Sequence, residues 1–158
     1  MSLPADTIAA ISTPPGPGAI GILRLSGPRA IEVAQASFRP LNKVPLSQHR
    51  PHELVYGDLL DRDGQPIDRV LCTFSRGPVS YTGEDTAELQ CHGSTAVLCA
   101  GLDALFAQGV RQAEAGEFSR RAFLNGKMGL SEAEAVHDLI TARTAEAAQN
   151  AAAQVMGA

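Results

Sequence analysis

The sequence lacks an apolar run that could cross a lipid bilayer, since a membrane helix needs about 20 consecutive apolar residues. Residues 1–13 also lack the basic segment and the long apolar stretch of a secretory signal peptide. Internal repeats are absent, and the apolar fraction of 44% is large enough for a folded core. These features predict a folded cytoplasmic protein with no membrane partner.

Cysteine is scarce, with only Cys72, Cys91 and Cys99 in the chain. An odd number at wide spacing is typical of reduced, partly buried thiols in a cytosolic protein rather than of a disulfide framework. Cys91 and His92 are adjacent, but neighbouring side chains of a strand point to opposite faces, so they are not expected to form a nucleophile and its base. The cysteines and histidines also lack the paired spacing of a zinc site. We therefore expect no metal site and no catalytic residue in this chain.

Phosphate-binding loops of the two common kinds are missing as well. Residues 126–128 read Gly-Lys-Met, and Arg121 stands where the first glycine of a P-loop belongs. Gly16–Gly21 matches the spacing of a dinucleotide fingerprint, but it contains proline and leads into a strand instead of a helix. We interpret it as a stiff turn that positions Arg24. The chain by itself is not expected to hydrolyse nucleotides.

Basic residues are not in excess, and the net charge of −4 argues against a domain that holds nucleic acid by bulk phosphate neutralisation. The segment 116–136 nevertheless concentrates cationic and aromatic side chains. They are Arg120, Arg121, Lys127, Phe118 and Phe123. The segment breaks at Asn125-Gly126 and begins again as a helix, with Ser131 and Glu134 spaced as a capping box. We interpret it as a cationic corner that faces an anionic ligand.

Apolar periodicity predicts an α+β domain. Strands are expected at Thr7–Ile11, Ile20–Leu25, His52–Leu60, Pro66–Phe74 and Thr86–Cys91, with a short edge strand at Val110–Ala113. Helices are expected at Pro28–Ala36 and Thr95–Ala107. The turn residues Asp61–Gly64 indicate a hairpin, and Arg39–Pro51 is expected to be a polar connection.

From Ser131 the sequence becomes rich in alanine and predicts one helix of about 25 residues that extends through Ala153. Its second half has little bulky apolar surface, and such a helix is marginal in water unless it packs against something else. We therefore divide the chain into an α+β domain, 1–125, and the beginning of a helical domain, 126–158.

Three charged residues are candidates for a binding site. Glu88 is central to its strand, on the face that also carries Thr86 and Gln90. A carboxylate there could accept two parallel N–H bonds from a guanidine-like ring edge, although a solvated strand face explains it equally well. Arg24 lies mid-strand after the glycine-rich turn, where arginines often only cover an edge with their alkyl stems. Lys127 lies in a loop between helices. Together, Arg24, Glu88 and Lys127 suggest a pocket for an anionic molecule with a donor-rich ring.

Three long motifs resemble, in order and spacing, the N-terminal region of the tRNA-modification GTPases of the MnmE or TrmE family. They are DTIAAISTPPGPGAIGILRLSG (6–27), SYTGEDTAELQCHG (80–93) and GEFSRRAFLNGKMGLSEAEAVHDLI (116–140). The resemblance extends from about Asp6 to the end of the chain. It implies that this sequence is the N-terminal part of a longer protein, and that the GTPase domain lies outside it.

The resemblance also implies a fold and a function. The fold would be a mixed sheet with flanking helices, similar to the tetrahydrofolate-binding domain of the glycine-cleavage T-protein, followed by the first helix of a helical domain. The domain would form a homodimer and bind 5-formyltetrahydrofolate near the dimer interface. GTP, Mg²⁺ and K⁺ would be bound by the GTPase domain. With the flavoprotein MnmG, the whole enzyme would add an aminomethyl-type group to the wobble uridine of certain tRNAs.

Carried over by position, the folate contacts of the family fall on Arg24, Glu88 and Lys127. Glu88 would hold the amino and ring N–H edge of the pterin, while the two cations would bind acidic or carbonyl groups. The chain departs from the family pattern at Gly129, where aspartate is more usual, and at Pro17, where a basic or small residue is common. One alternative is a dimerisation scaffold with a vestigial folate pocket. Another is a self-sufficient aminomethyltransferase like the T-protein, but 158 residues leave no room for the second folate-domain half that it needs.

Overall fold

A computed structural model describes residues 6–157, which form one mixed sheet of seven strands with helices on both sides. The strands are β1 (Ile8–Ile11), β2 (Gly18–Ser26), β3 (Phe38–Pro40), β4 (Val55–Leu60), β5 (Pro66–Ser75), β6 (Thr86–Gly93) and β7 (Arg111–Gln112). Their order across the sheet is β3-β4-β5-β6-β2-β1-β7, and only β1 and β7 run parallel. The predicted α+β class is confirmed.

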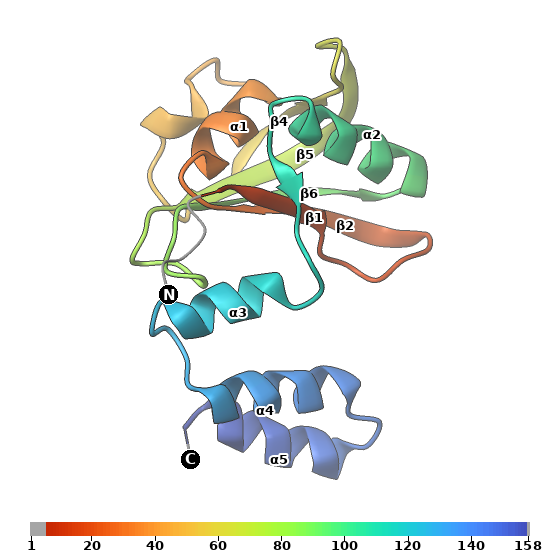
Figure 1. Ribbon diagram of the computed structural model, residues 1–158. Helices are drawn as coiled ribbons and strands as arrows, with labels where there is room; N and C mark the ends of the chain where they lie inside the picture. Colours follow the sequence, from red (N-terminus) through yellow and green to blue (C-terminus); the bar gives the residue numbers. More distant parts are fainter. Residues whose placement is uncertain (1–5, 158) are drawn as a thin grey trace.

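The central strands alternate between a buried and a more open face. On β6, Ala87, Leu89 and Cys91 are buried, whereas Glu88 and Gln90 lie on the opposite face, as the sequence predicts. The buried face is covered by α1 (Ala30–Ala36) and α2 (Thr95–Phe106), which form the hydrophobic core with it. Figure 1 shows these two helices on one side of the sheet and α3 on the other. We call the second side the outer face.

Two glycines allow α2 to approach the sheet closely. A Cβ atom at Gly21 of β2 would lie 2.4 Å from Leu98 Cδ1, and one at Gly101 of α2 would lie 2.8 Å from Leu23 Cδ1. Both distances are shorter than real Cβ contacts, so a larger residue at either position would force the leucine side chain to shift. The packing directs Leu23 into the core, and the alternation of the strand then places Arg24 on the outer face.

The predicted hairpin is confirmed, because β4 and β5 pair antiparallel around Asp61–Gly64. The connection Arg39–Pro51 is more ordered than predicted. Its beginning belongs to β3, which pairs with β4, and the 3₁₀ helix η1 (Leu46–Gln48) buries Leu46 completely. The apolar residues of this segment are isolated and show no periodicity, so the sequence does not predict a strand there. Only the pairing with β4 identifies β3 as an edge strand of the sheet.

The last part of the chain contains α3 (Glu117–Leu124), α4 (Leu130–Thr141) and α5 (Ala145–Val155). The single long helix predicted from Ser131 is therefore wrong. The chain becomes extended at Ala142, and the Thr144 hydroxyl accepts a hydrogen bond of 3.1 Å from the backbone N–H of Ala147, which begins α5. The two helices pack side by side as a hairpin and bury Ala135 and Ala151 (Figure 1).

The predicted capping box is also wrong. The N-cap of α4 is Gly129, which has extended backbone and makes no side-chain cap. Because the helix already begins at Leu130, Ser131 lies inside its first turn and cannot act as the residue before it. The residue that precedes the helix is thus the glycine at which this chain departs from the family pattern, and it contributes no side-chain cap.

Candidate functional site

Arg24 and Glu88 face each other across β2 and β6 on the outer face of the sheet. The two residues are paired in the register of the strands, and Arg24 Nη2 donates to Glu88 Oε1 at 3.3 Å. Their side chains are 32% and 29% exposed, so both are accessible from solvent although they lie on central strands. A charged pair on two central strands, half open to solvent, is a suitable starting point for a polar binding site.

Two aromatic rings border this pair. The guanidinium carbon of Arg24 lies 5.8 Å from the ring centre of Tyr81 and 5.5 Å from that of Phe118. Tyr81 belongs to the loop between β5 and β6, and Phe118 belongs to α3. The Tyr81 hydroxyl lies 3.1 Å from the Ser119 hydroxyl, which links the loop to the helix. Cation–π attraction holds Arg24 near these rings and orients its donors.

Lys127 lies in the connection between α3 and α4 and is exposed. It packs beside the turn at Gly83, where an added Cβ atom would lie 3.2 Å from Lys127 Cγ and 2.8 Å from Asn125 Cβ. Gly83 also has a φ of +82°, which favours glycine. The structure therefore brings Arg24 and Glu88 into contact and places Lys127 against the same loop that carries Tyr81.

Two hollows flank the Arg24–Glu88 pair. One of 340 Å³ is lined by Phe118 and by Ala10, the residue that pairs with Arg24 across β1 and β2. The other, of 270 Å³, is lined by Gln90, which lies two residues beyond Glu88 on the same strand face. The remaining lining residues of the second hollow are Ala19, Ile20, Tyr56, Arg69, Val70, Leu71, Cys91 and His92. Arg24, Glu88 and Lys127 line neither of them.

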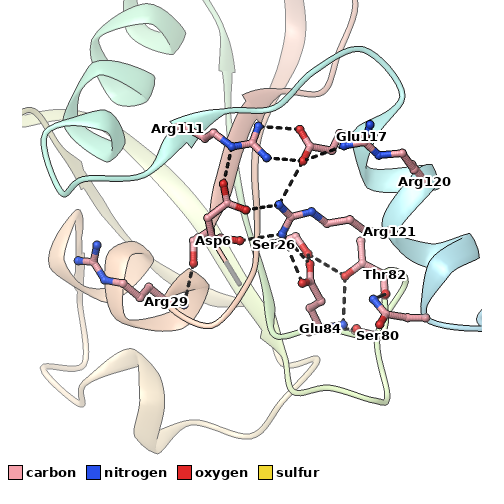
Figure 2. Close-up of polar contacts among 12 residues, drawn as sticks. Asp6, Ser26, Arg29, Ser80, Thr82, Glu84, Arg111, Glu117, Arg120 and Arg121 are labelled. Atoms are coloured by element: carbon pink, nitrogen blue, oxygen red, sulfur yellow. Dashed lines mark hydrogen bonds and ion pairs between the residues drawn. The ribbon is translucent and has the colours of Figure 1, made fainter. Parts of the chain in front are cut away.

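Arg121 is the main correction to the predicted cationic corner. It is only 1% exposed, and its charge is matched inside the protein (Figure 2). Its two terminal nitrogens donate to Asp6 Oδ1 at 2.7 Å, to Glu84 Oε1 at 3.1 Å and to Glu117 Oε2 at 3.1 Å. A ligand cannot reach a guanidinium that is surrounded in this way. Of the cationic residues predicted to form the corner, Arg120 and Lys127 remain exposed.

Glu117 is the second buried member of this group. Arg111 approaches it with both terminal nitrogens, at 2.9 Å and 2.6 Å, and the backbone N–H of Glu114 donates to Oε1 at 2.9 Å. The hydrogen bond from Arg111, followed by those from Glu114 and Arg121, lowers the pKa of Glu117 to about 2 against the effect of burial. Arg111 likewise lowers the pKa of Asp6. The group therefore remains ionised at neutral pH.

Sequence reasoning missed this group of ions. It gave no role to Glu84, whose carboxylate accepts hydrogen bonds from Arg121 and from the Ser26 hydroxyl. Asp6 and Arg111 are far apart in the sequence, so no local pattern indicated that they form an ion pair. The one available hint was the spacing of Glu117 and Arg121, four residues apart on a predicted helical segment.

Cys91 and His92 lie on opposite faces of β6, as the alternation of the strand predicts. Burial, with the nearby Asp68 charge, raises the pKa of Cys91 to about 12. His92 lies on the other face, is 73% exposed, and its Nδ1 atom lies 2.7 Å from Asp68 Oδ1. Among residues 6–157, no group of three or more metal-ligating side chains is arranged to hold an ion. In the same range, no helix is both long and apolar enough to span a membrane.

Known proteins resemble this chain strongly. Residues 7–127 match the family described as GTP-binding protein TrmE N-terminus. Over 152 residues the chain is 49% identical to the tRNA modification GTPase MnmE of Symbiobacterium thermophilum, and over 153 residues it is 48% identical to that of Carboxydothermus hydrogenoformans. Each alignment covers 96% of this chain and 33% of the relative. The chain thus spans about a third of the length of the curated relatives it matches.

Proposed function

Because the chain belongs to the family of TrmE N-terminal domains, we propose that it is the folate-binding and dimerisation region of a tRNA-modification GTPase. The ligand we propose is 5-formyltetrahydrofolate, an analogue of a one-carbon donor. The observation that carries this proposal is the Arg24–Glu88 pair on the outer face, bordered by Tyr81 and Phe118. A pterin needs such a combination of a carboxylate, a cation and aromatic surface.

Each residue of the site has a distinct role in the proposal. Among the contacts of residues 6–157, only one oxygen of Glu88 is engaged by Arg24, so the carboxylate can also accept from the amino group and ring N–H of a pterin. Arg24 keeps donors for a carbonyl or carboxylate group. Lys127, beside the Gly83 turn of the same loop, is exposed and would hold an acidic group of the ligand.

The second part of the proposal is a homodimer. The outer face beyond the Arg24–Glu88 pair is open and carries apolar side chains, of which Ile20 is 62% exposed and Tyr56 is 52% exposed. Apolar side chains on an open sheet face are typical of a protein interface. We propose that a second copy packs there, which would place the folate near the interface.

The rest of the function concerns the whole protein and is proposed from the relatives, whose name includes tRNA modification. With MnmG, the complete enzyme would add an aminomethyl-type group to the wobble uridine of tRNA in the cytoplasm. GTP, Mg²⁺ and K⁺ would be bound by a GTPase domain outside this sequence. This chain would bind the folate and dimerise, without catalysing a reaction by itself.

Calorimetry with 5-formyltetrahydrofolate tests the binding proposal directly. The wild-type chain should bind the ligand, Glu88→Ala should lose most of the affinity, and Glu32→Ala should retain it. Glu32 is a suitable control because it is an exposed glutamate on α1, on the opposite side of the sheet, and is also paired with an arginine. A wild-type chain that releases no heat and shows no binding would reject the folate site.

One observation favours a second candidate function. The Arg24–Glu88 bond joins residues that are paired in the register of β2 and β6, and such a cross-strand pair can serve only to join two strands. The chain would then be a dimerisation scaffold with a vestigial pocket. In that case Glu88→Ala would lower the stability of the fold, and neither it nor the wild type would bind the folate.

A further inference from the structure

The ions around the buried Arg121 connect parts of the chain that are distant in sequence. We define the Arg121 cluster by its five members, shown in Figure 2: Asp6, Glu84, Arg111, Glu117 and Arg121. Asp6 precedes β1, Arg111 lies on β7, and Glu84 ends the loop between β5 and β6. Glu117 and Arg121 belong to α3, so the cluster fastens this helix to the sheet and to the loop.

The same helix and loop supply the walls of the candidate ligand site. Tyr81 comes from the loop and Phe118 from α3, and both rings lie within 6 Å of the Arg24 guanidinium carbon (5.8 Å and 5.5 Å). The connection after α3 is also attached to the loop, because the Asn125 side-chain amide donates to the carbonyl of Thr82 at 2.8 Å. Every contact that shapes the site on this side therefore depends on how α3 lies against the loop.

We infer that the Arg121 cluster positions the ligand site: Arg121 and Glu117 hold α3 in the one orientation that brings Phe118 to the Arg24–Glu88 pair and Lys127 against the Tyr81 loop. This inference rests on the proposed folate function. Arg121 and Glu117 are positioning residues, since they are buried and do not contact the site themselves. The inference extends the site to residues that lie beneath its walls.

The chemistry of the cluster suits positioning better than simple adhesion. A planar guanidinium donates in fixed directions, and Arg121 uses them for Asp6, Glu84 and Glu117 at once. Apolar contacts would tolerate a helix that slides or rotates, whereas a buried charge that loses its partners is strongly unfavourable. The cluster contains three carboxylates and two guanidiniums, with Arg120 3.5 Å from Glu117 Oε2. Removing one arginine leaves carboxylates that repel each other.

A spectroscopic reporter separates positioning from binding. The chain contains no tryptophan, so Phe118→Trp introduces a single tryptophan next to Arg24, and excitation at 295 nm avoids its two tyrosines. In this background we would compare Glu117→Gln and Arg121→Lys, which keep the size or the charge of the native residue. Val33→Ala serves as the control, because Val33 is fully buried on α1 on the other side of the sheet. Folate affinity is measured by calorimetry in the same variants without the reporter.

The expected result is a red shift of the tryptophan emission in Glu117→Gln and Arg121→Lys, with folate affinity lowered roughly tenfold or more. The Val33→Ala control should unfold at a lower temperature and yet keep both the emission and the affinity of the wild type. Far-UV circular dichroism establishes that each variant is folded. If Arg121→Lys does not fold, the isosteric Glu117→Gln still provides both measurements.

Two negative results have different meanings. A wild-type chain that does not bind the folate rejects the proposed function, but the emission measurement still reports whether the cluster positions α3. Folded cluster variants whose emission and affinity match the wild type would overturn the inference itself. An equal loss of affinity in Val33→Ala would also overturn it, because the effect would then follow stability alone.

Discussion

Glu117 and Arg121 form an almost completely buried ion pair on α3, with Glu117 Oε2 3.1 Å from Arg121 Nη2. The two residues are one helical turn apart, and each has a further partner. Glu117 accepts a hydrogen bond from Arg111, and Arg121 donates one to Glu84. An exposed pair of this kind contributes less than about 1 kcal/mol. Breaking one side of a buried pair costs about 3–5 kcal/mol. The docking of α3 therefore depends on both residues.

Glu117→Gln should lower the free energy of unfolding near neutral pH by about 2–3 kcal/mol, because it removes the charge that Arg111 and Arg121 surround. The pKa of Glu117 is about 2 in the folded chain against its usual 4.5. A carboxylate with a depressed folded pKa contributes stability above its unfolded pKa and loses it as pH falls toward the folded value. The wild type and the variant should thus approach the same stability between pH 4.5 and pH 2.

Urea unfolding at a series of pH values measures this convergence. Asp6, whose pKa is also lowered by Arg111, will add to the loss of wild-type stability in the acidic range. A difference between the two proteins that stays constant from neutral to acidic pH would contradict the assignment of Glu117 as a buried, ionised partner.

Glu88→Ala should weaken folate binding more than Lys127→Ala does. The alanine leaves ring donors of the bound pterin without an acceptor, which costs about 1–3 kcal/mol. Lys127 is exposed, so water can replace part of its contact with an acidic group of the ligand. Titration calorimetry of the two variants gives the comparison, and equal, negligible losses would argue against the pocket.

Ile20→Glu should weaken the proposed homodimer, because it places a charge on the open apolar part of the outer face. Sedimentation equilibrium at micromolar concentration would show a larger monomer fraction than in the wild type. Met156→Glu is the matched control, since Met156 is 82% exposed but lies at the end of α5. A wild type that is purely monomeric, or equal effects of both substitutions, would rule out this face as the interface.

Gly83→Ala should destabilise the chain and loosen the connection that carries Lys127. The new methyl group would lie 2.8 Å from Asn125 Cβ, on a residue whose φ is +82°. The backbone strain alone costs about 1–2 kcal/mol. Gly64→Ala is a close control, because Gly64 has a φ of +80° and open space around it. Thermal unfolding of both variants isolates the steric part, and an equal effect would show that the Asn125 contact does not matter.

Cys99 should react with a thiol reagent in the folded chain, whereas Cys72 and Cys91 should not. Cys99 is exposed, and the other two thiols are buried. Burial raises the pKa of both buried thiols, so the reactive thiolate is depleted in addition to being inaccessible. Titration with Ellman's reagent should show one fast equivalent, and two more only after denaturation. Three fast equivalents would mean that the core around Cys72 is more open than described.

Much of the sheet could be predicted from the sequence because strand formation leaves a local pattern. The alternation around Glu88 correctly assigned its neighbours Leu89 and Cys91 to the core, and the turn residues at Asp61–Gly64 correctly indicated the hairpin. The family could also be recognised, since three long motifs occur in one order. The pairing of Arg24 with Glu88 across two strands follows from the register, which local patterns leave open.

The sequence by itself determined most of the strands, the two helices that cover the core, and which residue types are available for a ligand. Only the tertiary structure decided which charges are free. Arg121 and Lys127 look alike in the sequence, yet one is buried among carboxylates and the other is exposed. The physical reason is that the energy of a charge depends on the partners that folding brings to it, here Asp6 and Glu84 from distant parts of the chain.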